Sequence, residues 1–149
     1  MKDLGRVLML VFMFSGFCFT KAQQNHSLSE IESKLSQSPK NLVIKFSTNW
    51  CGVCSIQKQK IEKNEELKKF LNESFYYLEF DAESKEDFIF AGNQFKAGKG
   101  KMHEFTELLL NGNPVYPAWV ILNSDLEIIF QYQGLLETHE LISIFEQIL

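Results

Sequence analysis

The chain has 149 residues, of which 45% are hydrophobic and 13% aromatic, enough for one domain with a packed core. Its formal net charge is −4, and its only arginine is Arg6. Because arginine is the preferred partner of phosphate and guanine, the composition argues against a nucleic-acid-binding role.

The first 22 residues have the pattern of a secretory signal peptide. Lys2 and Arg6 precede an apolar run over residues 7–19, and the small residue Ala22 follows. The run has about 13 residues, fewer than the roughly 20 of a membrane-spanning helix, so an uncleaved anchor is the less favoured alternative. We expect a mature domain of residues 23–149, without a membrane span, in the periplasm or outside the cell.

Signal removal makes the chain more acidic and leaves two cysteines. Lys2, Arg6, Lys21 and Asp3 leave with residues 1–22, so the net charge changes from −4 to −6. Acidity of this size mainly supports solubility. Cys18 also leaves.

The mature chain begins with a predicted helix and strand. Leu28, Ile31 and Leu35 recur at helical spacing, which predicts a helix within residues 27–37. The compact apolar run at residues 41–46 predicts a central strand.

A two-part helix is predicted to follow this strand. It starts near Cys51, with Ile56 and Ile61 as its apolar positions. Asn64 is a typical N-cap, so we expect the helix to restart there. The aromatic run at residues 75–80 predicts the second strand.

The segment 82–113 predicts a loop and then an amphipathic helix that ends near Asn111 and Gly112. The apolar positions of this helix are Met102, Phe105, Leu108 and Leu109. After Pro117, two apolar runs separated by turn residues predict an antiparallel hairpin. A last helix is expected behind Thr138 as its cap.

The elements therefore follow the order helix, strand, helix, strand, helix, strand, strand, helix. A helix joins the first two strands, which makes them parallel, and the last two form a hairpin. We predict an α/β fold with a central mixed sheet of about four strands and helices on both faces.

Cys51 and Cys54 form the motif with the clearest chemistry. Cys51 lies where a strand meets a helix, so free amide groups and the helix dipole favour its thiolate. Cys54, one helical turn later, can resolve a mixed disulfide formed on Cys51.

Three other uses of the pair are less favoured. A structural zinc site needs about four ligands, and the histidines are scattered at positions 26, 103 and 139. A c-type haem needs a histidine directly after Cys54, where Ser55 stands. A structural disulfide closing so short a loop would stabilise the chain little. We expect a redox pair that uses no metal and no organic cofactor.

The run FSTNWCGVC, residues 46–54, and the later Tyr116-Pro117-Ala118 resemble the thioredoxin superfamily. The resemblance covers about residues 40–149 and implies a thioredoxin-like fold. Within this superfamily, the sequence is most similar to exported thioredoxin-like thiol-disulfide oxidoreductases of bacterial envelopes.

The resemblance implies that Cys51 is an exposed nucleophile, Cys54 a buried resolving thiol and Pro117 a cis-proline beside them. From the residues alone, Pro117 fits a trans proline at the start of a strand equally well.

The resemblance also implies a substrate-binding surface of Trp50, Gly52, Val53 and Tyr116 around Pro117. For Trp50 and Tyr116 the alternative is a place in the core, the commoner fate of aromatic residues.

Lys45 departs from the thioredoxin pattern, in which a buried acid stands six residues before the first cysteine. We hypothesise that Lys45 lies beneath the site and favours the cysteine thiolates. The alternative is a lysine that reaches solvent at the edge of a strand.

The expected activity is exchange of dithiols and disulfides with protein partners, and with a redox protein that recycles the site. Gly52 and Val53 include no histidine, which favours a reductase or exchange catalyst over a strong oxidase. The alternatives are a non-catalytic peptide-binding module or a thiol peroxidase. We expect a monomer and treat His103 and His139 as surface or cap residues.

Overall fold

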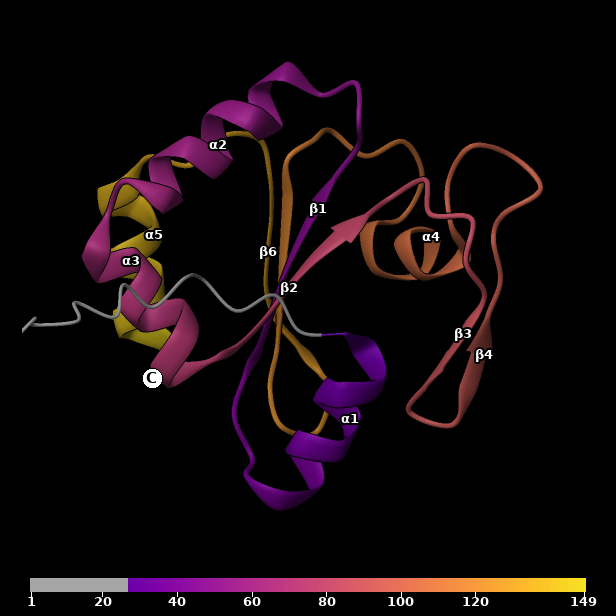
Figure 1. Ribbon diagram of the computed structural model, residues 1–149, viewed down its shortest axis with the longest axis horizontal. Coiled ribbons are helices and arrows are strands. Elements are labelled where there is room, and N and C mark those ends of the chain that lie inside the picture. The colour runs from indigo at the N-terminus through magenta and orange to yellow at the C-terminus, as the bar shows by residue number, and fades with distance from the viewer. Residues whose placement is uncertain (1–26) are drawn as a thin grey trace, which may run out of the picture.

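The computed structural model describes residues 27–149, so the predicted signal peptide lies outside the described residues. A four-stranded sheet in the order β2-β1-β5-β6 forms the centre (Figure 1). β1 (Leu42–Ser47) runs parallel to β2 (Tyr76–Asp81) and antiparallel to β5 (Ala118–Leu122). β6 (Ile128–Gln133) pairs antiparallel with β5. The predicted mixed sheet is confirmed.

Helices cover both faces of this sheet, as predicted (Figure 1). One face packs against α1 (Leu28–Gln37) and α4 (Glu104–Leu110). The other packs against α2 (Gly52–Glu62), α3 (Glu65–Lys69) and α5 (Thr138–Ile148). The protein is therefore a three-layer α/β domain.

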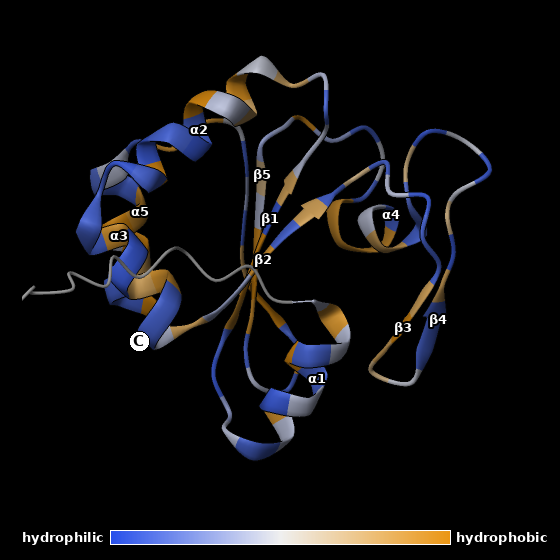
Figure 2. Cartoon of the chain, viewed as in Figure 1, coloured by the Kyte–Doolittle hydropathy of each residue, from blue (hydrophilic) through white to orange (hydrophobic). Residues whose placement is uncertain are grey.

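The alternation of side chains along β1 explains the two cores. Residues of a strand point alternately to opposite faces, so Leu42, Ile44 and Phe46 enter one core and Val43 the other. Lys45 shares the face of Val43, beneath α2. The apolar strands appear as the hydrophobic centre of Figure 2, between helices that carry hydrophilic residues.

The helix after β1 has two parts, as predicted. Asn64 caps α3 by accepting the Leu67 N–H at 2.8 Å, and a π-helical turn, Phe70–Ser74, continues it. The expected inward position of Ile56 is wrong, because this side chain is 48% exposed. Gln57 points inward instead.

Gln57 is fully buried and joins α2 to the segment before α5. Its Nε2 donates to the Leu136 carbonyl at 3.1 Å, and its Oε1 accepts the Leu136 N–H at 2.9 Å. Both polar ends of the amide are satisfied, which is what allows a glutamine into the core.

The expected loop after residue 82 contains a short hairpin. β3 (Phe88–Phe90) and β4 (Asn93–Phe95) pair antiparallel around Ala91 and Gly92. Both turn residues have positive φ, 51° and 73°, as a two-residue hairpin turn requires. Alanine is rarely found there, and three-residue strands give little pattern, so the sequence did not reveal it.

The hairpin carries aromatic rings into the core beside α4. Phe88, Phe90 and Phe95 each contact Phe105, with ring centroids 5.4, 5.9 and 5.2 Å away. These edge-on contacts hold the hairpin against the domain.

α4 begins at Glu104, after Met102, and its apolar face differs by one position from the prediction. Leu108 is 60% exposed, and Leu110 is buried in its place. The helix ends at Leu110, before the C-cap Asn111, with a φ of 52°, and Gly112, with a φ of 84°, close to the end that the sequence predicts.

His103 is the N-cap of α4, and it is buried rather than on the surface. Its Nδ1 accepts the Phe105 N–H at 3.1 Å, so its Nε2, 3.0 Å from the Glu86 carbonyl, is the donor. The imidazole stacks on Phe88 at 5.0 Å with an interplanar angle of 4°.

Replacing His103 with leucine should lower the free energy of unfolding by about 2 kcal/mol, since a cap is lost and buried polar groups lose their partner. Urea unfolding of the mature domain measures this change. His139→Leu is the matched control, because His139 is exposed, and it should change stability by less than about 0.5 kcal/mol. Equal losses in the two variants would show that the His103 contacts carry no stability.

α5 starts one residue earlier than predicted. Its cap is Glu137, not Thr138, and Glu140 reaches back to the Glu137 N–H at 2.7 Å in a capping box.

Within residues 27–149, no helix has the length and apolar character needed to cross a membrane.

Candidate active site

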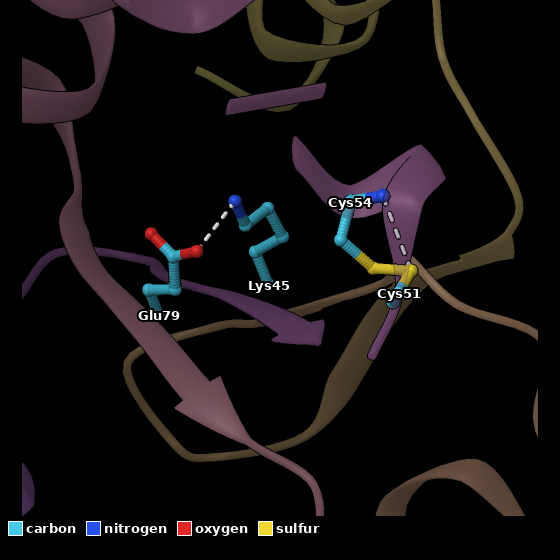
Figure 3. The surroundings of a disulfide bond; sticks show 4 residues. All are labelled: Lys45, Cys51, Cys54 and Glu79. Atoms are coloured by element: carbon cyan, nitrogen blue, oxygen red, sulfur yellow. Dashed lines mark hydrogen bonds and ion pairs between the residues drawn. A yellow bond between two sulfur atoms is a disulfide. The ribbon is translucent and has the colours of Figure 1, made fainter. Parts of the chain in front are cut away.

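Cys51 lies between β1 and α2, where the sequence predicts it. It is the N-cap of α2, and its Sγ accepts the Cys54 N–H at 3.1 Å. A disulfide joins Cys51 to Cys54 (Figure 3). The first sulfur therefore lies at the positive end of a helix of 11 residues, which stabilises an anion on that sulfur.

Both cysteines are largely covered in this disulfide state. Cys51 is 8% exposed and Cys54 is 5% exposed, so the expectation of an exposed Cys51 is wrong and that of a buried Cys54 is confirmed. A thiolate attacks a disulfide sulfur in line with the S–S bond, so a narrow opening at one sulfur is sufficient.

The Tyr116–Pro117 peptide bond is cis, as the resemblance implies. The Tyr116 ring packs edge-on against Trp50, with centroids 6.2 Å apart and an interplanar angle of 75°. Trp50 is 68% exposed, which excludes a place in the core, whereas Tyr116 is half-buried and packs partly against the core.

The first turn of α2 adds an exposed apolar strip next to Trp50. Gly52 is exposed, Val53 is 44% exposed and Ile56 is 48% exposed. Val53 and Ile56, three residues apart, lie on one side of the first turns of α2, and Trp50 directly precedes the N-cap Cys51. Sequence reasoning named Trp50 and Val53 and missed Ile56.

Glu83 and Asp81 border the same aromatic pair. The Trp50 Nε1–H donates to Glu83 Oε2 at 3.2 Å. Burial, followed by the charges of Glu83 and Asp81, raises the pKa of Tyr116 to about 12. The Tyr116 hydroxyl donates to the Met102 sulfur at 3.7 Å.

Sequence reasoning did not name Glu83 or Asp81, although the parallel strands gave a signal. Ser47 at the end of β1 pairs with Asp81 at the end of β2. Since parallel strands end at the same edge of a sheet, the segment after Asp81 lies beside the segment after Ser47.

Lys45 is fully buried on the central strand, so the alternative of a lysine that reaches solvent is wrong. Its Nζ lies 2.8 Å from Glu79 Oε1, and Glu79 stands directly opposite it on β2. Figure 3 shows the ammonium turned toward Glu79, with the disulfide on the other side of the lysine.

Burial lowers the pKa of Lys45, and the charge of Glu79 opposes this shift. The Glu79 side chain keeps 28% of its exposure, so solvent reaches one end of the pair. Glu79 is a second charged residue under the site that sequence reasoning did not identify.

Metal ligation has no visible basis in the described part of the chain, where no three His, Cys, Asp or Glu side chains are grouped to hold an ion. The site places a cysteine pair that can alternate between dithiol and disulfide at a helix N-terminus. The exposed Trp50 lies on one side of this pair and the ion pair of the buried Lys45 with Glu79 on the other.

Comparisons with known proteins agree with this geometry. Residues 28–149 match the family model of a thioredoxin-like domain. No curated protein matches the sequence.

Several solved structures share the fold. The DsbH oxidoreductase has a TM-score of 0.52 at 17% identity, over 74% of this chain and 72% of that chain. A disulphide isomerase from Xylella fastidiosa Temecula1 has a TM-score of 0.51 at 16% identity, over 87% and 95%. The oxidised C-terminal domain of DsbD from Neisseria meningitidis has a TM-score of 0.53 at 17% identity, over 81% and 90%. At these identities the likeness shows the fold alone.

Proposed function

The chain belongs to the family of thioredoxin-like domains, and on that premise we propose that it is a protein thiol-disulfide oxidoreductase whose reacting pair is Cys51 and Cys54. The observation that carries this proposal is the disulfide between the two cysteines at the N-terminus of α2. The cis Pro117 and the exposed Trp50 support it.

The reaction starts from the reduced pair. The Cys51 thiolate attacks one sulfur of a partner disulfide, that S–S bond breaks, and the departing partner thiolate takes up a proton. Cys54 then loses its proton and its thiolate attacks Cys51 Sγ, which releases the second partner thiolate. The partner gains two electrons and two protons, and a disulfide joins Cys51 to Cys54.

The helix start makes the first step favourable. The Cys54 N–H that donates to Cys51 Sγ would form a charge-assisted hydrogen bond to the thiolate in the reduced protein. Together with the helix dipole, this bond lowers the free energy of the anion relative to the thiol. Recycling to the dithiol needs a second protein dithiol as electron donor.

We assign Trp50, Gly52, Val53, Tyr116 and Pro117 to the surface that receives the partner. The exposed Trp50, Gly52 and Val53 and the half-buried Tyr116 are accessible to a protein segment, whereas Pro117 itself is buried. An extended partner segment can pair with the backbone beside Pro117, as in β-strand addition.

The direction that we propose is reduction or general exchange. Gly52 and Val53 between the cysteines offer no imidazolium to stabilise the reduced form, and such stabilisation is what makes a strong oxidase. The signal-peptide pattern supports a place in the periplasm or outside the cell.

The redox potential of the cysteine pair tests the direction. Equilibration of residues 23–149 with dithiothreitol buffers should give a potential closer to the about −270 mV of thioredoxin than to the about −120 mV of a strong oxidant. A value near the second figure would contradict the direction. Failure to reduce insulin with dithiothreitol as the electron donor would contradict the function itself.

A further inference from the structure

Two carboxylates border the surface that a partner must cross to reach Cys51. Asp81 ends β2, and its Oδ1 accepts the Glu83 N–H at 3.0 Å. Glu83 in turn accepts the indole N–H of Trp50, directly before Cys51. We call Asp81 and Glu83 the acidic edge of the site.

Among the described residues, neither carboxylate of the acidic edge forms an ion pair. Within residues 27–149, no lysine or histidine lies within ion-pair distance of either carboxylate. This includes Lys85, which is on the same loop. The charges of both carboxylates raise the pKa of Tyr116, and no positive charge contributes to this shift. The charges that act most on the Tyr116 hydroxyl are therefore those of two carboxylates.

A second observation at the same place indicates the kind of ligand. The Trp50 ring is 68% exposed beside the carboxylate that holds it. An exposed indole next to a carboxylate that has no ion-pair partner within residues 27–149 suits a lysine or arginine side chain, which can lay its stem and cation on the ring and its charge near the carboxylate. An acidic partner segment would meet repulsion here.

This inference rests on the proposed function and names its substrate class: we propose that the acidic edge makes the site select disulfide partners that carry a positively charged residue next to the reacting cysteine. Glu83 is the specificity-determining residue, and Asp81 adds a second negative charge behind it. Because both side chains are half-buried, salt should weaken the selection without removing it.

The test uses disulfide-bonded peptides that are identical except for a lysine, glutamine or glutamate beside the cysteine. For the reduced mature protein, kcat/KM should be about tenfold higher for the lysine peptide than for the glutamate peptide, and Glu83→Gln should cut this ratio to about threefold. Glutamine keeps an acceptor for the Trp50 indole, so the variant removes charge rather than geometry.

Ratios between peptides are the decisive readout, because a change in Cys51 reactivity alters the rates of all peptides alike. The matched control is Glu66→Gln, which removes the same charge from the exposed surface of α3 and should leave the ratio unchanged. Binding of peptides with serine in place of cysteine is measured in parallel by fluorescence anisotropy.

The outcomes separate the two proposals. Exchange with the same lysine preference in wild type and Glu83→Gln, or with no preference, overturns the acidic edge and leaves the proposed function standing. No exchange, but a lysine preference in binding that Glu83→Gln removes, overturns the proposed function and supports the acidic edge. If neither exchange nor charge-dependent binding is seen, both are wrong.

Discussion

Replacing Cys51 with serine should lower the rate of disulfide exchange by more than about a thousandfold. A serine hydroxyl is not ionised at neutral pH, so the attacking anion at the start of α2 is lost. The side chain is nearly isosteric and Cys51 sits at a cap position that serine also favours, so the fold should persist. Insulin reduction and exchange with a peptide disulfide measure the loss.

The Cys54→Ser variant is the companion measurement. It keeps the attacking sulfur and lacks the resolving one, so it should stop after one turnover and accumulate a mixed disulfide between Cys51 and the partner. Mass spectrometry under non-reducing conditions detects that adduct. Ser55→Ala, one exposed residue later, should react like the wild type.

These variants also decide between the catalytic and non-catalytic readings of the fold. If Cys51→Ser retained exchange, or Cys54→Ser turned over at the wild-type rate, the assignment of the two sulfurs would be wrong. A peptide-binding module would keep its affinity in Cys51→Ser and show no exchange in the wild type. Consumption of hydrogen peroxide by the reduced wild type would indicate the peroxidase alternative.

The second large effect is expected from Glu79→Gln, which should lower the free energy of unfolding at neutral pH by about 3 kcal/mol. Lys45 is fully buried, and without the carboxylate 2.8 Å away its charge loses its ion-pair partner. The estimate is at the lower end of the range for broken buried pairs because Glu79 keeps some contact with solvent. Chemical denaturation gives the value.

The pH dependence of this loss follows from the direction of the Lys45 pKa shift. Burial lowers the pKa of Lys45 below its ordinary value of 10.5, so near that pH the unfolded chain binds more protons than the folded chain. The contribution of Lys45 to stability therefore rises as pH increases from its folded pKa toward 10.5. In Glu79→Gln the interval between the folded pKa of Lys45 and 10.5 should be wider. The difference in the free energy of unfolding between this variant and the wild type should therefore become smaller at alkaline pH.

Lys45→Met provides the comparison for both effects. It removes the buried charge, so the alkaline rise in stability should disappear. It also tests the proposed influence on the cysteines, because loss of a nearby cation should raise the thiol pKa values of the reduced pair. An unchanged titration of Cys51 and Cys54 would contradict that role, and the ion pair with Glu79 already limits the size of the change.

An exposed ion pair serves as the control for stability. Glu65 lies 2.6 Å from Lys68 on α3, with its side chain 88% exposed. Glu65→Gln should lose no more than about 0.5 kcal/mol, since exposed pairs are screened by water and salt. If Glu79→Gln lowered the free energy of unfolding by as little, the ion pair between Lys45 and Glu79 would not contribute to stability.

Local patterns in the sequence were sufficient for most of the fold. The spacing of apolar residues and the caps and turn residues between them predicted β1, β2, the β5–β6 hairpin and most helices, because each depends on neighbours within a few positions. The place of Cys51 at the junction of β1 and α2 followed from the same patterns. The thioredoxin resemblance added the cis geometry of Pro117, which local sequence leaves open.

Tertiary structure alone decided which polar side chains meet around the disulfide. Glu79 reaches Lys45 through the register of two strands, and Glu83 reaches Trp50 across a separation of 33 residues. The inward turn of Gln57 depends on a backbone partner 79 residues away. Apolar periodicity says which face of an element is buried, but a buried polar group is stable only where a distant partner completes its hydrogen bonds or its charge, and that partner is fixed by packing.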